Sequence, residues 1–250
     1  MDNNTLIKKL FVVGIGPGNI EDMTIRAHRI LSECDVIAGY TVYCDLVRPF
    51  FADKEYLSTP MMGEEKRVRL AFEAAEKGKK VALICSGDAG VYGLAGLAVL
   101  AREEFKDVEI EVIPGVTAAL SGGALLGAPL IHDFCLISLS DRLTPWEVIE
   151  KRLHNAALAD MVIVLYNPES KSRVGYLKRA CNILMEIYPP DRVCAEVNNI
   201  GREKQERHIM TLEQLKEFKA DMFSTVFIGN SCSHQCMEFM VTPRGYKSEK

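Results

Sequence analysis

Residues 10–19 read LFVVGIGPGN, an apolar run followed by three glycines that alternate with other residues. The run from Leu10 to Val13 has the composition of a buried β-strand, and the glycines permit a tight turn that a ligand can approach closely. A dinucleotide-binding turn has the pattern Gly-x-Gly-x-x-Gly, and Asn19 stands where its third glycine would be. The stretch predicts a strand and a turn, the usual beginning of an α/β fold, without the dinucleotide pattern.

Two further features of this turn disfavour a phosphate ligand. Pro17 has no backbone N–H to donate, and Glu21 and Asp22 place negative charge near the expected start of the next helix. The turn therefore suits a neutral or cationic ligand. A purely structural strand–turn–helix connection explains the same residues and stays open as an alternative.

The composition is that of an ordinary soluble globular protein. The chain has 250 residues, of which 48% are hydrophobic and 26% charged, with a formal net charge of -4. This charge gives no overall attraction to nucleic acid or to an anionic membrane. No apolar run approaches the roughly 18 residues that span a bilayer, and the start MDNNTLIKKLF lacks the order of a signal peptide. We expect a cytoplasmic protein without nucleic-acid or membrane partners.

The cysteines are scattered through the chain. There are eight, several within apolar runs, so we expect free thiols packed as small hydrophobic residues. The stretch CSHQC brings Cys232, His234 and Cys236 close together in sequence. No second pair lies nearby to complete four ligands, so we expect no metal site.

Strand-like and helix-like segments alternate along most of the chain. The expected strands occupy 10–13, 36–37, 81–85, 108–113, 134–139, 161–165, 192–197 and 225–228. Helical spacing is plain in 64–77, and IPGVTAALSGG at 113–123 predicts a turn and a small-residue helix. The pattern predicts an α/β fold with largely parallel sheets, in two domains of residues 1–114 and 115–250.

Ligand sites in α/β sheets gather where the strands end. The loop SGDAGVYG at 86–93 places Gly87, Gly90 and Gly93 around Asp88. It predicts a backbone cradle in which Asp88 either fixes the turn or meets a cation. A flexible connection without a ligand is the alternative.

Taken together, the loops resemble those of the tetrapyrrole methylase family, enzymes that transfer a methyl group from S-adenosylmethionine. The first half contributes VVGIGPGN, SGDAGVYG and IPGVTAA. The second half contributes GAPLIHDFCLISLSDRLTPWEVIEKRL, LYNPESKSR and TPRGY. These later motifs resemble the branch that methylates C17 of precorrin-3B or cobalt-precorrin-3 and contracts the macrocycle, in cobalamin biosynthesis.

The resemblance implies two α/β domains with a cofactor cleft between them, a tetrapyrrole substrate and a homodimer. It also implies that Pro17 and Gly18 line the tetrapyrrole side of that cleft. Motif matching assigns contacts with S-adenosylmethionine to ten residues: Gly87, Asp88, Val91, Tyr92, Thr117, Ala118, Tyr166, Asn167, Asn198 and Thr242.

Methyl transfer from a sulfonium to a nucleophilic ring carbon needs positioning and desolvation more than a nucleophilic side chain. Ring contraction moves protons, and His132 and Asp141 are the candidates for an acid or base. A structural histidine and a local turn hydrogen bond are the respective alternatives. The arginines expected to pair with substrate carboxylates are Arg142, Arg173, Arg202 and Arg244, each of which can equally be a surface charge.

Two other enzyme functions stay open at this point. One is a methylase of the same fold that acts on another precorrin position or on a modified protein side chain. The other is an NAD-dependent oxidoreductase, which needs an acidic residue at the end of the second strand. Asp35 stands at the beginning of that strand, which disfavours this alternative. A non-catalytic binding module is disfavoured by the number of glycine-rich loops at strand ends.

Overall fold

The computed structural model describes residues 8–245. The chain divides into two compact units, Met1–Thr117 and Ala118–Lys250, called unit 1 and unit 2 below. The boundary expected after residue 114 lies in the same loop as this division. Among the described residues, no helix is both long enough and apolar enough to span a membrane.

Unit 1 contains one five-stranded sheet in the order β3-β2-β4-β1-β5, and every pair of neighbouring strands is parallel. Its strands are β1 (Lys8–Gly14), β2 (Val36–Tyr40), β3 (Glu55–Thr59), β4 (Val81–Cys85) and β5 (Val108–Ile113). Its helices are α1 (Ile25–Glu33), α2 (Thr41–Val47), α3 (Glu64–Glu76) and α4 (Ala95–Ala101). The helix expected at 64–77 is confirmed as α3.

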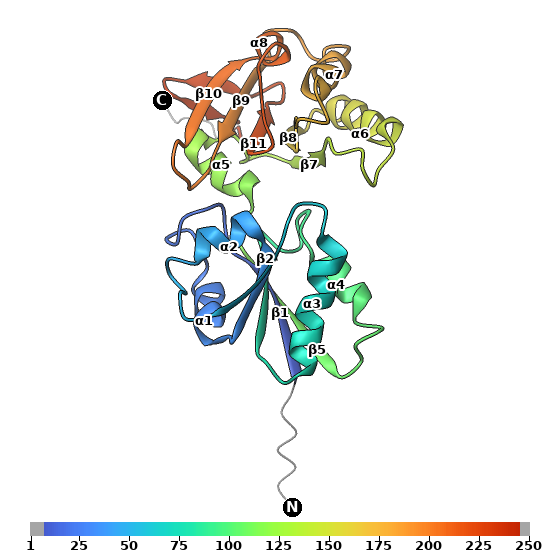
Figure 1. The fold of residues 1–250 in the computed structure, drawn as a ribbon. Helices are drawn as coiled ribbons and strands as arrows, with labels where there is room; N and C mark the ends of the chain where they lie inside the picture. The colour runs from blue at the N-terminus through green and yellow to red at the C-terminus, as the bar shows by residue number, and fades with distance from the viewer. Residues whose placement is uncertain (1–7, 246–250) are drawn as a thin grey trace, which may run out of the picture. The chain divides into compact units, whose positions relative to one another are not determined.

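Both faces of this sheet are covered by helices. Helices α1 and α2 lie on one side, and α3 and α4 lie on the other (Figure 1). Side chains alternate along each strand, so Leu10 and Val12 face α3 and α4, whereas Phe11 and Val13 face α1 and α2. Because all five strands are parallel, their carboxyl ends share one edge, called the carboxyl edge below.

Unit 2 contains a five-stranded sheet in the order β10-β9-β11-β8-β7 and a small sheet in the order β12-β13-β6. Its strands are β6 (Gly127–Ala128), β7 (Phe134–Ser138), β8 (Val162–Tyr166), β9 (Val193–Asn198), β10 (Glu206–Thr211), β11 (Ser224–Ile228), β12 (His234–Cys236) and β13 (Phe239–Val241). Its helices are α5 (Ala118–Leu126), α6 (Trp146–Leu158), α7 (Tyr176–Leu184) and α8 (Leu212–Lys216).

The α/β class is confirmed, but the larger sheet of unit 2 differs from the largely parallel arrangement expected. Strands β7 and β8 are parallel, whereas β11 is antiparallel to β8 and β9, and β10 is antiparallel to β9. The cause is the short connection 199–205, which turns the chain back from β9 into β10 without a crossover helix. Strands β7, β8 and β9 still run in one direction, so their ends also share a carboxyl edge.

Candidate functional site

Three loops meet at the carboxyl edge of unit 1, following β1, β4 and β5. The Gly16 N–H donates to Gly87 O (3.1 Å), and the Gly87 N–H donates to Gly16 O (2.7 Å). A Cβ on Gly115 would lie 2.2 Å from Gly87 O, and one on Gly14 would lie 2.7 Å from Gly115 N. The three loops therefore touch through their backbones, and only glycine fits at these crossings.

Asp88 fixes this arrangement. Its Oδ1 accepts a hydrogen bond from Gly90 N (2.8 Å), and its Oδ2 accepts one from Gly115 N (2.9 Å). One carboxylate thereby closes its own turn and ties the loop after β4 to the loop after β5. The geometry favours the turn-fixing role that the sequence left open.

The glycine turn after β1 does not run directly into a helix. Asn19 Oδ1 accepts from Asp22 N (2.7 Å), and Asn19 Nδ2 donates to Asp22 Oδ2 (2.7 Å). Helix α1 begins only at Ile25, after the cap formed by Thr24 Oγ1 and Ala27 N (3.1 Å). The turn therefore lacks the adjoining helix N-terminus on which a pyrophosphate rests.

Asp35, the acidic residue that an NAD site would require, lies at the amino end of β2. Its Oδ2 accepts a hydrogen bond from Lys80 N (2.7 Å), which links the start of β2 to the residue before β4. Asp35 therefore has a structural role. Tyr40 occupies the carboxyl end of the strand instead. This geometry argues against the oxidoreductase alternative.

The predicted residues of unit 1 gather at this edge. Tyr92 is 55% exposed and has a left-handed backbone (φ 52), and Val91 beside it is half-buried. Left-handed non-glycine residues are uncommon and concentrate at ligand sites. The seven residues placed there are Pro17, Gly18, Gly87, Asp88, Val91, Tyr92 and Thr117.

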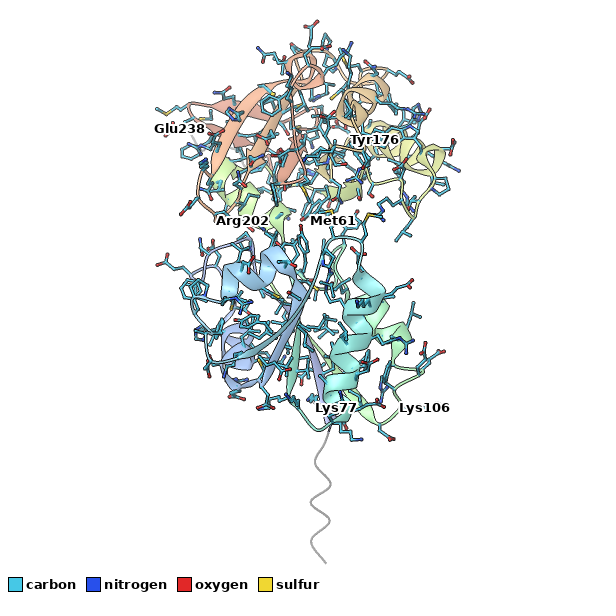
Figure 2. The ribbon with its side chains drawn as sticks, viewed as in Figure 1. Met61, Lys77, Lys106, Tyr176, Arg202 and Glu238 are labelled. Atoms are coloured by element: carbon cyan, nitrogen blue, oxygen red, sulfur yellow. The ribbon has the colours of Figure 1, made fainter. Side chains whose placement is uncertain are left out.

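In unit 2, a hydrogen-bonded group lies at the carboxyl ends of β7 and β8. Asn167 Nδ2 donates to Ser138 Oγ (3.0 Å), and the Tyr176 hydroxyl donates to Asp141 Oδ2 (2.6 Å). The hydrogen bond to the Asp141 carboxylate raises the pKa of Tyr176 above its ordinary 10.0. Tyr176, labelled in Figure 2, is the first residue of α7, so this bond joins the loop after β7 to that helix.

Arg173 lies in the loop between β8 and α7, three residues before Tyr176. Its positive charge opposes the rise in the pKa of Tyr176. Its backbone N–H donates to Ser170 O (3.0 Å). The side-chain Nε is buried and has no hydrogen-bond partner in the described part of the chain. A buried guanidinium N–H without an acceptor is costly, and a bound carboxylate would supply one.

Tyr166 ends β8 and Asn167 follows it, beside the start of α5. The N–H of Ala119 donates to the Tyr166 hydroxyl (2.8 Å), and Asn167 has a left-handed backbone (φ 53). Ala118, the first residue of α5, is therefore held close to the end of β8. These three predicted cofactor residues are brought together within unit 2.

Asn198 lies at the carboxyl end of β9, and its amide is already engaged. Its Nδ2 donates to Asp221 Oδ1 and to Ser224 Oγ, each at 3.0 Å. Ser224 Oγ in turn donates to Glu196 Oε1 (2.5 Å). Arg202, in the following loop, has its guanidinium over the Phe223 ring (5.2 Å).

Glu196 is a buried acid within this cluster. It is 1% exposed, and its Oε2 has no hydrogen-bond partner among the described residues. Burial raises the pKa of Glu196 above its ordinary 4.5, while the hydrogen bond from Ser224 opposes the shift.

Two predicted residues lie away from the carboxyl edge of unit 2. His132 precedes β7, at the amino end of the strand whose other end leads to Asp141, and it is exposed. Thr242 is fully buried, with its hydroxyl 2.7 Å from Ser233 Oγ in a cluster that follows β11. Since β11 is antiparallel to β8, that cluster lies near the amino end of β8. The remaining arginines, Arg142 and Arg244, are exposed.

Within residues 8–245, no group of three or more His, Cys, Asp or Glu side chains can hold a metal ion. Cys232 and Cys236 are exposed free thiols. Most of the other cysteines are buried, and burial raises the pKa of Cys34, Cys44 and Cys85 to about 11. Such thiols are inert packing residues.

Sequence reasoning missed two features of these edges. Tyr176, the partner of Asp141, gives no recognisable signal because it is separated from that carboxylate by an entire helix–strand unit. The turn after β3, which contains Met61 and Met62, was missed because the half-exposed β3 was not recognised as a strand. No alternation of apolar and polar residues marks β3, because apolar Tyr56 and Leu57 are adjacent in EYLST.

Each unit is thus an α/β body with glycine-rich or polar loops at strand ends, as in enzymes that bind small molecules. Residues 9–216 match the family model Tetrapyrrole (Corrin/Porphyrin) Methylases. Because this match covers most of the chain, the protein belongs to that family.

Individual relatives support the same placement. A probable cobalt-factor III C(17)-methyltransferase of Salmonella typhimurium is 45% identical, over 95% of this chain and 99% of the relative. A precorrin-3B C(17)-methyltransferase of Sinorhizobium sp is 38% identical, over 88% of each chain. The chain spans only 45% of a cobalt-factor III methyltransferase of Priestia megaterium, at 44% identity.

Solved structures agree. The crystal structure of the methyltransferase CobJ has a TM-score of 0.87 and 34% identity, over 94% of this chain and 99% of that one. A Thermus thermophilus uroporphyrin-III C-methyltransferase complexed with S-adenyl homocysteine has a TM-score of 0.72 at 24% identity, over 88% and 97% of the two chains, and shows the shared fold. The predicted family, fold class and methyltransferase activity are confirmed.

Proposed function

We propose that the protein methylates C17 of precorrin-3B or its cobalt-containing counterpart in cobalamin biosynthesis, with S-adenosylmethionine as the methyl donor and with contraction of the macrocycle. The observation that carries the cofactor assignment is the set of three loops locked together at the carboxyl edge of unit 1. The names of the relatives support the substrate and the position of methylation.

The loops of unit 1 fit a cationic cofactor without phosphates. The segments 14–18, 86–93 and 114–117 contain no Lys or Arg, and Asp88 is their one charged residue. Tyr92 and Val91 offer apolar surface beside backbone N–H and C=O groups. We assign cofactor contacts to Gly87, Val91, Tyr92 and Thr117, with Asp88 holding the loops in place. The cofactor supplies an electrophilic methyl group, and the loops orient it and exclude water.

The carboxyl edge of unit 2 fits an anionic substrate. The Nε of Arg173, which has no hydrogen-bond partner in the described chain, suits a carboxylate. The Tyr176 hydroxyl donates its proton to the Asp141 carboxylate, so the two side chains share a proton that can be transferred. We assign substrate binding to Arg173 and proton transfer during ring contraction to the pair of Asp141 and Tyr176. His132 and Thr242 have no part in this assignment because of their places in the fold.

The first test is a calorimetric titration of the purified protein with S-adenosylhomocysteine, with NAD in a parallel cell. We expect micromolar binding of S-adenosylhomocysteine, one molecule per chain, and no heat from NAD. Tyr92→Ala should weaken this binding by about tenfold through loss of aromatic contact. Phe50→Ala, which truncates another exposed aromatic residue outside the edge loops, is the matched control and should leave it unchanged.

The second test is an anaerobic assay with cobalt-factor III and S-adenosylmethionine, in which the methylated product is identified by its mass and the methylated carbon by NMR. Methylation at C17 supports the proposal, whereas methylation at another ring carbon favours the alternative methylase. Binding of NAD without S-adenosylhomocysteine contradicts both methylase functions.

A further inference from the structure

The turn between β3 and α3 exposes two methionine side chains at the carboxyl edge of unit 1. Met61 is 45% exposed and Met62 is 68% exposed. Met62 also has a left-handed backbone (φ 70), a conformation that costs free energy in any residue other than glycine. A strained turn that presents apolar side chains to solvent needs an explanation beyond connecting two elements.

A buried arginine on α3 holds the turn in place through hydrogen bonds. Arg67, on α3, is 4% exposed; its Nε donates to Thr59 Oγ1 (2.9 Å) and its Nη2 donates to Pro60 O (3.1 Å). Its guanidinium also lies over the Tyr40 ring (5.8 Å) at the end of β2. These charge-assisted bonds tie the side chain of the last residue of β3 and the backbone of the first turn residue to α3. The residues that precede Met61 and Met62 are therefore ordered by hydrogen bonds to Arg67.

The position of the turn relates it to the cofactor loops. In the sheet order β3-β2-β4-β1-β5, β3 is separated from β4 by a single strand. Two interstrand spacings amount to about 10 Å, so the end of β3, which leads into the methionines, lies about that far along the edge from the end of β4, where the loop 86–93 begins. Figure 2 shows Met61 at the edge where α3 begins, with Lys77 at the opposite edge of the unit. A flat ligand of tetrapyrrole size that reaches the cofactor loops also reaches this turn.

We propose that Met61 and Met62 form an apolar platform against which the conjugated face of the tetrapyrrole lies, and so help to determine its position relative to the cofactor. This inference rests on the proposed function. Methionine suits the role because its unbranched thioether adapts to a ring surface and makes favourable sulfur–aromatic contacts. A turn of positively charged residues would instead favour the carboxylate rim of the substrate over its face.

The test measures steady-state kinetics of Met61→Ala/Met62→Ala with cobalt-factor III, together with the Kd for S-adenosylhomocysteine. We expect the KM for the tetrapyrrole to rise about tenfold while the Kd for S-adenosylhomocysteine stays unchanged. Met61→Leu/Met62→Leu should restore most of the loss, because it returns the apolar volume. Leu100→Ala, at a 70% exposed position on α4, is the control for loss of an exposed apolar side chain and should leave the KM unchanged.

Met62→Gly separates contact from backbone strain. Glycine adopts the left-handed conformation freely, so this variant keeps or raises the Tm while it removes the thioether. A raised KM in this well-folded variant supports the platform, and an unchanged KM in both Met62→Gly and the double alanine variant overturns it. If the KM is unchanged in both variants while the wild-type protein binds S-adenosylhomocysteine and methylates the substrate, only the platform proposal is wrong. If the wild-type protein neither binds S-adenosylhomocysteine nor methylates the substrate, the proposed function itself is wrong.

Discussion

At the scale of single residues, Gly115 is the position where the site tolerates least change. A Cβ there would stand 2.2 Å from Gly87 O and 2.7 Å from the carbonyl of Gly14, both of them backbone atoms of ordered loops. Gly115→Ala should therefore cost about 1–3 kcal/mol of stability. For a chain of this length the Tm falls by roughly 2–4 °C per kcal/mol. Because the loops separate, S-adenosylhomocysteine binding should be lost as well.

The control is another glycine of the same unit. Gly96, in α4, has no atom within 4 Å of the place where a Cβ would stand. Gly96→Ala should raise stability, by up to about 1 kcal/mol, because alanine favours the helix. Thermal unfolding followed by circular dichroism checks both variants. Equal Tm values for Gly115→Ala and the wild type would contradict the backbone contact between the loops.

Glu196 gives a pH-dependent prediction at the same scale. Its pKa is raised above 4.5 by burial, so the unfolded chain releases the proton more readily than the folded one. The stability contributed by the neutral acid is fully present below pH 4.5 and is lost as the pH rises through the folded-state pKa. Glu196→Gln keeps an acceptor for Ser224 and carries no charge. We expect this variant to match the wild type in acid and to exceed its Tm at pH 8.

Thermal unfolding of both proteins between pH 4 and pH 8 measures the difference. A Tm difference that does not change with pH would show that Glu196 has an ordinary pKa. Glu186→Gln, at an exposed position, is the control for the charge change and should leave the pH profile unaltered.

At the scale of elements, the sequence predicted the buried strands and also β5 and β7, which carry exposed residues, but it missed five strands: β3, β6, β10, β12 and β13. Strands β1 and β4 read as continuous apolar runs because helices cover both sides. Strand β10 reads ERHIMT and lies at a sheet edge, so its charged residues obscure the pattern. The direction of β10 was equally hidden, because it depends on the turn at 199–205 rather than on side-chain periodicity.

In the candidate site, the positions of the loops were predictable from the sequence, whereas the contacts between their side chains were not. Glycine-rich loops follow buried strands and could be located, which is why the predicted residues of unit 1 gather at one edge. Contacts made by side chains from distant elements were not predictable. The bonds of Asp88 to Gly115 and of Tyr176 to Asp141 depend on how the strands are ordered in the sheets.

The bond between Tyr176 and Asp141 gives a prediction for the loop at 139–145. Because it ties that loop to the start of α7, Tyr176→Phe should speed amide hydrogen exchange in the loop. Burial raises the pKa of Tyr56 and of Tyr188 to about 12 in both proteins. The wild type should contain one further phenol that titrates above pH 10.0 and is missing from the variant's alkaline absorbance titration. Asp141→Asn keeps an acceptor without the charge, so we expect the loop to stay protected while the pKa of Tyr176 falls back toward 10.0. Unchanged exchange in Tyr176→Phe would contradict the link.

At the scale of the whole molecule, the net charge of -4 opposes an anionic substrate, so binding depends on local positive charge. Arg173→Gln removes the guanidinium whose Nε has no partner in the described chain, and should raise the KM for cobalt-factor III by about tenfold or more. Arg152→Gln, at an exposed position on α6, is the control because it changes the net charge by the same amount.

The two variants separate a local contact from a long-range field. The Debye length is about 10 Å at 0.1 M salt, so added salt weakens attraction between exposed charges at long range and affects a close, buried pair much less. If Arg173 binds a carboxylate directly, the KM of Arg173→Gln stays above that of Arg152→Gln from 0.05 to 0.5 M salt. If only net charge matters, the two variants have equal KM values throughout and converge on the wild type at high salt. Steady-state kinetics across this salt range distinguishes the two, and the unpartnered Nε favours the first outcome.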